Sequence, residues 1–203
     1  YFDQVNDSIV EKVYTFSTSP FSNGIWVHND SKNNVFMDND LQASDCGFNV
    51  YGIPSNPALN SNNIFLRNRV QSGGGDVIMY SQNNIFMGNS SSAGMYLEYA
   101  SSNIVSGNRM NSRIDFFGPS NNNIISDNQL QGGIYMDSSS SERNLISGNR
   151  FESGSLSILG SYNSLVGNVI YEMVSDGADI TGNNNLVASN YFYDTSNPGY
   201  GIK

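Results

Sequence analysis

Three acidic side chains are the first candidates for chemistry in this sequence: Glu98, Asp115 and Asp137. Glycoside hydrolysis needs two carboxylates about 5 to 10 Å apart, one acting as an acid and the other as a base or nucleophile. Carboxylates also occur on any solvated surface. The sequence therefore favours no catalytic residue and keeps these three as the alternative.

Other reactive groups are scarce. The lone histidine, His28, is interpreted as a surface residue, and Arg109 with Arg113 is the one basic pair that a lyase could use. The single cysteine, Cys46, excludes an internal disulfide, and the absence of any C-x-x-C motif excludes thiolate metal chemistry. The segment Asp38–Asp40 could offer oxygens to calcium, but its two acids diverge in an extended chain. No metal and no other cofactor is predicted.

The net charge of the chain excludes some classes of binding partner. The 203 residues include 9 Lys+Arg and 18 Asp+Glu, a formal net charge of −9. This field repels nucleic acid and anionic lipid, and no apolar run is long enough to insert into a membrane. Abundant Asn, Ser, Tyr and Gly with few lysines favours an extracellular or cell-surface location. The first residue is Tyr1, as expected of a mature product or an excised fragment.

An internal repeat indicates how these side chains are positioned. The motif N-x-x-x-x-N occurs eight times, and its second asparagines lie 29, 21, 19, 20, 21, 19 and 22 residues apart. Asparagine tolerates left-handed backbone conformations, and stacked asparagine amides can hydrogen-bond from one repeat to the next. We therefore expect a structural ladder formed by Asn39, Asn68, Asn89, Asn108, Asn128, Asn149, Asn168 and Asn190.

Apolar residues around the motif recur with period 2, which is typical of strands with one buried face. The residue two places after the first asparagine is apolar in all eight copies, from Phe36 to Val187. The residue two places after the second is apolar in all copies except Ser91. Upstream, pairs such as Ile25/Val27 and Val77/Met79 are expected to point inward. Units this short cannot bury their own apolar face, so they must stack as coils around a shared core.

The repeat resembles the N-x-I-x-x-N-x-I pattern of right-handed parallel β-helices of the pectin-lyase-like superfamily, found in bacterial and archaeal surface proteins. The resemblance implies one all-β solenoid over residues 1–203, with about eight to nine coils of ~20 residues. Within it we expect an N-terminal coil or cap at 1–23, an inserted loop at 52–61 and an incomplete last coil at 193–203. The superfamily includes lyases, hydrolases, epimerases, tailspikes and adhesins, so the fold does not decide the function. The paired-Asp, Gly-His-Gly, Arg-x-Lys and Asp-Pro-His-Glu motifs of its enzymes are absent.

Residues between the buried ones of the upstream strand are expected to point outward and form an aromatic and acidic ribbon along one sheet. Flat rings and carboxylates suit the apolar faces and hydroxyl groups of sugars, although the rings could equally stabilise one another. The candidate glycan-binding residues of this ribbon are Trp26, Tyr51, Tyr80, Tyr96, Glu98, Asp115, Tyr135 and Asp137.

A further apolar column immediately precedes the buried Phe36-to-Val187 column. This aliphatic column comprises Val35, Ile64, Ile85, Ile104, Ile124, Leu145 and Leu186, interrupted by Ser164. Adjacent residues of one strand cannot both point inward, so the column either sits at a corner, which we favour, or lies outside. An outside column would mark a protein interface.

These observations predict a non-enzymatic extracellular protein that builds a surface assembly. It would self-associate into a filament or layer through its coil ends, where Gly201–Ile202 resembles the start of another coil, or through the aliphatic column. The alternative is a polysaccharide lyase, hydrolase or epimerase, or a glycan-binding module, that uses the ribbon.

Overall fold

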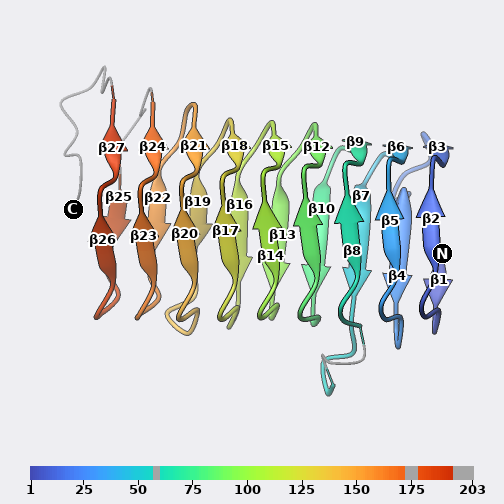
Figure 1. Ribbon diagram of the computed structural model, residues 1–203, viewed down its shortest axis with the longest axis horizontal. Helices are drawn as coiled ribbons and strands as arrows, with labels where there is room; N and C mark the ends of the chain where they lie inside the picture. Colours follow the sequence, from blue (N-terminus) through green and yellow to red (C-terminus); the bar gives the residue numbers. More distant parts are fainter. Residues whose placement is uncertain (57–59, 172–177, 194–203) are drawn as a thin grey trace.

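The computed structural model describes residues 1–56, 60–171 and 178–193. Within these ranges the chain is all-β and contains no helix. Three parallel sheets of nine strands each run the length of a solenoid, and each coil contributes one short strand to each sheet (Figure 1). The predicted stacking of coils around a shared core is thus confirmed.

We call the three sheets A, B and C in the order in which each coil visits them. Sheet A consists of β1 (Phe2–Asp3), β4 (Ile25–His28), β7 (Cys46–Tyr51), β10 (Gly75–Met79), β13 (Met95–Glu98), β16 (Ile114–Phe117), β19 (Ile134–Met136), β22 (Leu156–Ile158) and β25 (Ala178–Ile180). Sheet B consists of β2 (Ile9–Glu11), β5 (Val35–Met37), β8 (Ile64–Leu66), β11 (Ile85–Met87), β14 (Ile104–Ser106), β17 (Ile124–Ser126), β20 (Leu145–Ser147), β23 (Ser164–Val166) and β26 (Leu186–Ala188). Sheet C consists of β3 (Tyr14–Phe16), β6 (Asp40–Gln42), β9 (Arg69–Gln71), β12 (Ser90–Ser91), β15 (Arg109–Met110), β18 (Gln129–Leu130), β21 (Arg150–Phe151), β24 (Val169–Ile170) and β27 (Tyr191–Phe192).

The core is a continuous column of side chains contributed by the middle residue of each sheet B strand and its counterparts in sheets A and C. Phe36, Phe65 and Phe86 are fully buried and stack face to face, with ring centroids 5.0 and 4.2 Å apart. Because each coil is too thin to bury these rings alone, every coil depends on the coils above and below it.

Asparagine ladders run along both ends of sheet B. In the predicted ladder, Asn89 donates from its backbone N and from Nδ2 to Oδ1 of Asn108, at 2.8 and 3.0 Å. The Nδ2 of Asn108 in turn reaches Oδ1 of Asn128 and the carbonyl of Phe86, at 3.0 and 2.9 Å. The first asparagines of the motif, from Asn34 to Asn185, form a second ladder of the same kind. The ladder is therefore confirmed, and it is doubled.

The left-handed backbone residue is not the ladder asparagine but the residue before it. Asn33 and Asp38, which precede Asn34 and Asn39, have φ of 57° and 54°, and this pattern holds before every ladder asparagine. The asparagine needs an ordinary conformation to point its amide inward, so its neighbour makes the bend. Arg67, Arg143 and Tyr162 also occupy this conformation, which costs a side-chain-bearing residue about 1–2 kcal/mol.

The predicted register of β10 is wrong. Ile78 is buried, whereas Val77 and Met79 face outward, because the ladder between β7 and β10 shifts between Gly75 and Val77. This irregularity places Asp76 at an inward position beside Met95 of the next coil.

The aliphatic column lies on the outside of sheet B, so the corner interpretation is wrong. Each sheet B strand is a short extended segment whose first and third residues face outward and whose middle residue is inside, as Val35, Phe36 and Met37 show. Both bends fall at the left-handed residues outside the strand, which leaves Val35 within a straight segment. The column continues through Ile9, which pairs with Val35 and is 66% exposed.

Two segments were predicted to depart from the regular coils: an inserted loop at 52–61 and an incomplete last coil at 193–203. In the expected loop at 52–61, Ile53 and Asn56 form an isolated antiparallel bridge. The rest of that loop at 57–59 lies outside the described residues, as do Gly201–Ile202 and nearly all of 193–203.

Candidate functional site

The ribbon predicted from the sequence lies on the outer face of sheet A, in two adjacent columns. One column follows the register from Trp26 through Tyr96 and Asp115 to Tyr135, and the other from His28 through Tyr51 and Glu98 to Phe117. Tyr80 is not part of either column, because it follows β10 in a left-handed conformation with φ of 49°. Asp137 follows β19 and is exposed.

Aromatic rings contact one another along this face. His28 stacks with Tyr51 at 5.5 Å between ring centroids, Tyr51 meets Tyr80 edge-on at 5.9 Å, and Tyr80 stacks on Tyr99 at 4.9 Å. Trp26, which is 36% exposed, lies 5.4 Å from the His28 ring. Tyr99 was not predicted as part of the ribbon, although its place directly after β13 matches that of Tyr80 after β10. The rings therefore stabilise one another and still present an exposed edge.

Tyr96 and Phe117 form a second stacked pair on the same face, with ring centroids 5.8 Å apart. Phe117 stands between the coil of Glu98 and the coil of Asp137, so the apolar ring separates these two carboxylates. The structure thus does not place Glu98 directly beside Asp137.

Asp115 lies on the outer side of the strand but is covered. Its relative exposure is 2%, because Arg113 folds over it and donates from Nε to Oδ2 at 3.0 Å. Burial raises the pKa of Asp115, and Arg113 opposes that shift. The same guanidinium carbon lies 5.4 Å above the Tyr135 ring. Oδ1 of Asp115, 2.8 Å from the same nitrogen, has no hydrogen-bond partner among the described residues.

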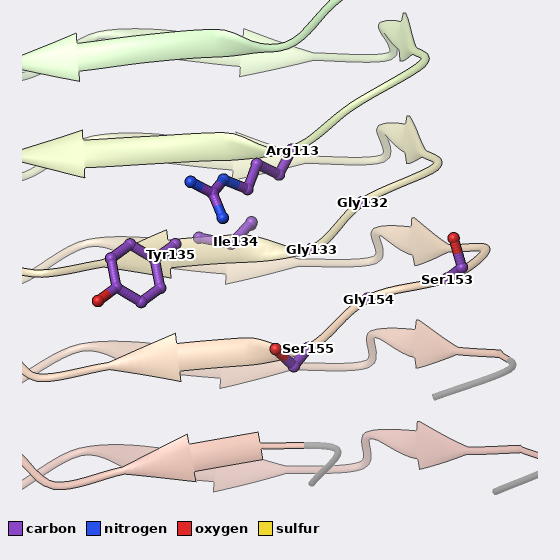
Figure 2. Close-up of a pocket in the computed structure, with 8 residues that line it drawn as sticks. All are labelled: Arg113, Gly132, Gly133, Ile134, Tyr135, Ser153, Gly154 and Ser155. Atoms are coloured by element: carbon purple, nitrogen blue, oxygen red, sulfur yellow. The ribbon is translucent and has the colours of Figure 1, made fainter. Parts of the chain in front are cut away.

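A hollow of about 220 Å³ adjoins this cluster where the chain passes from sheet C to sheet A (Figure 2). Arg113 and Tyr135 border one side, and Ser153 and Ser155 border the other. Gly133 in its floor is required by close backbone packing, since a Cβ there would lie 1.8 Å from the carbonyl oxygen of Ser155. The hollow combines a cation, an aromatic face and hydroxyl groups, which are the groups that sugars contact.

A buried polar cluster inside the solenoid was also missed. Asp76 is 2% exposed; its Oδ1 accepts the backbone N–H of Phe48 at 2.9 Å, and its carboxylate bonds to the Ser91 hydroxyl. Burial raises the pKa of Asp76 to about 7. Burial together with Asp45 and Asp76 raises the pKa of the Cys46 thiol to about 12. The signal for this cluster was Ser91, the one polar residue in its otherwise apolar column.

Within the described ranges, no three His, Cys, Asp or Glu side chains are grouped to hold a metal ion. The part of the chain that the structure describes has no helix with the length and apolarity to cross a membrane. Compared with known proteins, the chain matches no protein-family model, and neither a curated protein nor a solved structure gives a significant match.

Proposed function

We propose that this chain is a non-enzymatic structural protein of an extracellular or cell-surface assembly, and that copies self-associate into a filament or layer. The observation that carries the proposal is the aliphatic column on the outside of sheet B. Five of its members, Ile64, Ile85, Ile104, Ile124 and Leu145, occupy the same outward position on consecutive coils. Such a stripe in water is unfavourable unless another surface covers it.

The dimensions of sheet B fit an interface. Nine strands spaced about 4.8 Å apart make a face about 40 Å long, and three-residue strands make it about 10 Å wide. This gives about 400 Å² from the strands alone, and the flanking turns extend it toward the roughly 800 Å² per partner of a stable complex.

The charge of sheet B supports the same proposal. Among the residues of its nine strands, Glu11 is the only charged one, although the chain carries 27 charged residues in total. The strand faces can therefore approach without desolvating ions, whereas the flanking turns carry charges such as Asp38, Arg67 and Asp127 at the rim of the contact. The repulsion due to the net charge of −9 is screened over about 8 Å at physiological ionic strength. A second copy of this chain is the partner that presents the matching uncharged flat face. Pairing of like faces closes as a dimer, so contacts at the coil ends would extend such dimers into a filament or layer.

We expect Ile104→Lys to weaken self-association at least about tenfold, because an unpaired ammonium would be buried at the centre of the contact. Sedimentation velocity over a range of protein concentrations at moderate salt measures this. Gln131→Lys is the matched control: it adds the same charge at an exposed residue outside the strands of sheet B, and it should assemble like the native chain. Circular dichroism confirms that both variants fold.

Two results would contradict this proposal. A native chain that stays monomeric at high concentration and moderate salt would show that the chain does not self-associate. Equal assembly of native protein and Ile104→Lys would show that copies meet elsewhere, for example at the coil ends.

Glycan binding on the outer face of sheet A is the second candidate function. It would agree with a relationship to the pectin-lyase-like β-helices, which the sequence repeat resembles. The hollow bordered by Arg113, Tyr135, Ser153 and Ser155 favours glycan binding, because a guanidinium, an aromatic face and hydroxyl groups meet there at the surface. This proposal includes the catalytic alternative for Glu98, Asp115 and Asp137.

We expect Tyr135→Ala to weaken binding of a responsive polysaccharide at least about tenfold, since stacking against the ring is lost. Polyuronates and neutral glycans are titrated by calorimetry. Tyr162→Ala is the matched control, because Tyr162 is also exposed beneath an arginine, with Arg143 at 5.6 Å. Release of reducing or unsaturated ends that is lost on changing Glu98, Asp115 or Asp137 would show an enzyme. No binding to any glycan tested, or equal loss in both tyrosine variants, would count against this candidate.

A further inference from the structure

A second hollow, of about 210 Å³, lies on the outer face of sheet C, away from the ribbon. It is bordered by Arg69 of β9 and Arg109 of β15, and Ser90 of β12 lies between them. Strands β9, β12 and β15 are consecutive neighbours in the sheet (Figure 1). The two arginines therefore stand two strand spacings apart, about 10 Å, across a small side chain.

The register places the Arg69 and Arg109 side chains in one outward column, although the Arg69 guanidinium pairs with Asp40 of β6, on the side of β9 opposite Ser90. Val70, Ser91 and Met110, which follow these three residues, are buried, so Arg69, Ser90 and Arg109 all point outward in one column. An arginine side chain is long enough to reach over Ser90 from either neighbouring strand, and Arg69 would do so by turning its guanidinium from Asp40 toward the hollow.

The two arginines differ in how their charge is balanced. Arg69 Nη1 pairs with Asp40 at 3.1 Å, which leaves its other donors free. Arg109 has no ion pair or hydrogen bond from its side chain to any described residue. The strands β12 and β15 themselves contain no acidic residue. Local charge at Ser90 is thus positive although the chain as a whole is negative.

A second pair of arginines on sheet C provides a comparison, because there a side chain fills the space between the two guanidinium groups. Arg109 and Arg150 also stand two strands apart, with Gln129 between them. There the longer side chain occupies the space, and its Nε2 donates to the carboxylate of Glu152, which lies 3.9 Å from Arg150. At Ser90 both the filling side chain and the carboxylate are missing.

We propose that the Arg69–Ser90–Arg109 hollow binds a tetrahedral oxyanion, a sulfate or phosphate group. Guanidinium groups present paired N–H donors that match such oxygens, and an anion bridging both arginines would supply the negative charge that Arg109 lacks. The Ser90 hydroxyl adds a donor from below. This site is independent of the proposed assembly and of the ribbon.

Calorimetric titration with sodium sulfate, at an ionic strength held constant with sodium chloride, tests the proposal. We expect saturable binding that Arg109→Gln weakens at least tenfold and Arg69→Gln weakens less. Arg143→Gln is the matched control, because it removes the same charge from an exposed residue just before β20 of sheet B, outside the hollow, and should bind sulfate like the native chain. Repeating the titration in the Ile104→Lys background separates this site from any effect of self-association.

Further arms identify the ligand class. Inorganic phosphate should bind at the same site, and the tighter of the two anions indicates which ester the site prefers. Absence of saturable binding by either anion, equal binding by acetate, or an equal loss in Arg143→Gln and Arg109→Gln would each overturn the proposal.

Discussion

Asn108→Ala is expected to lower the free energy of unfolding by about 4 kcal/mol. The side chain of Asn108 is 1% exposed, and its amide joins three coils. Its removal takes the acceptor Oδ1 from the backbone N and one Nδ2 hydrogen of Asn89, and it takes the Nδ2 donor from the carbonyl of Phe86 and from Oδ1 of Asn128. Each buried polar group that loses its partner costs about 1–3 kcal/mol. Urea unfolding followed by circular dichroism measures the change.

Asn108→Asp should cost more than Asn108→Ala at neutral pH. An oxygen then replaces Nδ2 opposite the carbonyl of Phe86 and Oδ1 of Asn128, and a charge is buried without a cation. Part of this loss should be recovered in acid, where the protonated carboxyl can donate. The matched control is Asn183→Ala, an exposed asparagine whose side chain belongs to neither ladder. A loss in Asn108→Ala no larger than that in Asn183→Ala would contradict the ladder's energetic role.

The solenoid could be predicted because its constraint repeats. Every coil must supply an inward amide at the same height and an inward apolar residue two places later, so the pattern N-x-F-x-x-N at Asn34–Asn39 specifies a strand with two bends. The direction of the aliphatic column was harder, because Val35 and Phe36 are both apolar and hydrophobicity alone does not separate inside from outside. The bends decide it, and they lie at Asn33 and Asp38, outside the strand.

The candidate sites were only partly predictable, since they depend on contacts between side chains of different coils. Asp115 has the outward position expected of it, but its cover comes from Arg113, two residues earlier in the same coil. The hollow at Ser90 arises because a short residue stands between Arg69 and Arg109, which are far apart in sequence. Only the strand register brings them together.

The irregular coil at β10 has the most direct consequence for stability. Asp76 is inside the solenoid, where the ladder shift after Gly75 places it, and one hydroxyl and one backbone N–H are the donors to its carboxylate. Burial outweighs these two bonds and raises its pKa to about 7. In the unfolded chain the same group has an ordinary pKa of about 3.9. Between these values the folded protein binds a proton that the unfolded chain does not.

The free energy of unfolding should therefore fall as the pH rises from about 4 to about 7, and this contribution should level off above pH 7. The pKa difference corresponds to about 4 kcal/mol. Asp76→Asn removes the titration while keeping an oxygen for the Phe48 N–H, and its Nδ2 can donate to Ser91.

The difference in unfolding free energy between Asp76→Asn and the native chain isolates this group, because the other titrating residues cancel. It should be small near pH 4 and favour Asp76→Asn by about 4 kcal/mol at pH 8, as measured by urea unfolding at several pH values. Asp179→Asn, which changes an exposed carboxylate on β25, should show no such trend. A difference that stays constant between pH 4 and 8 would mean that Asp76 carries the same charge when the chain is folded as when it is unfolded. Burial of the Asp76 carboxylate would then make no pH-dependent contribution to the free energy of unfolding.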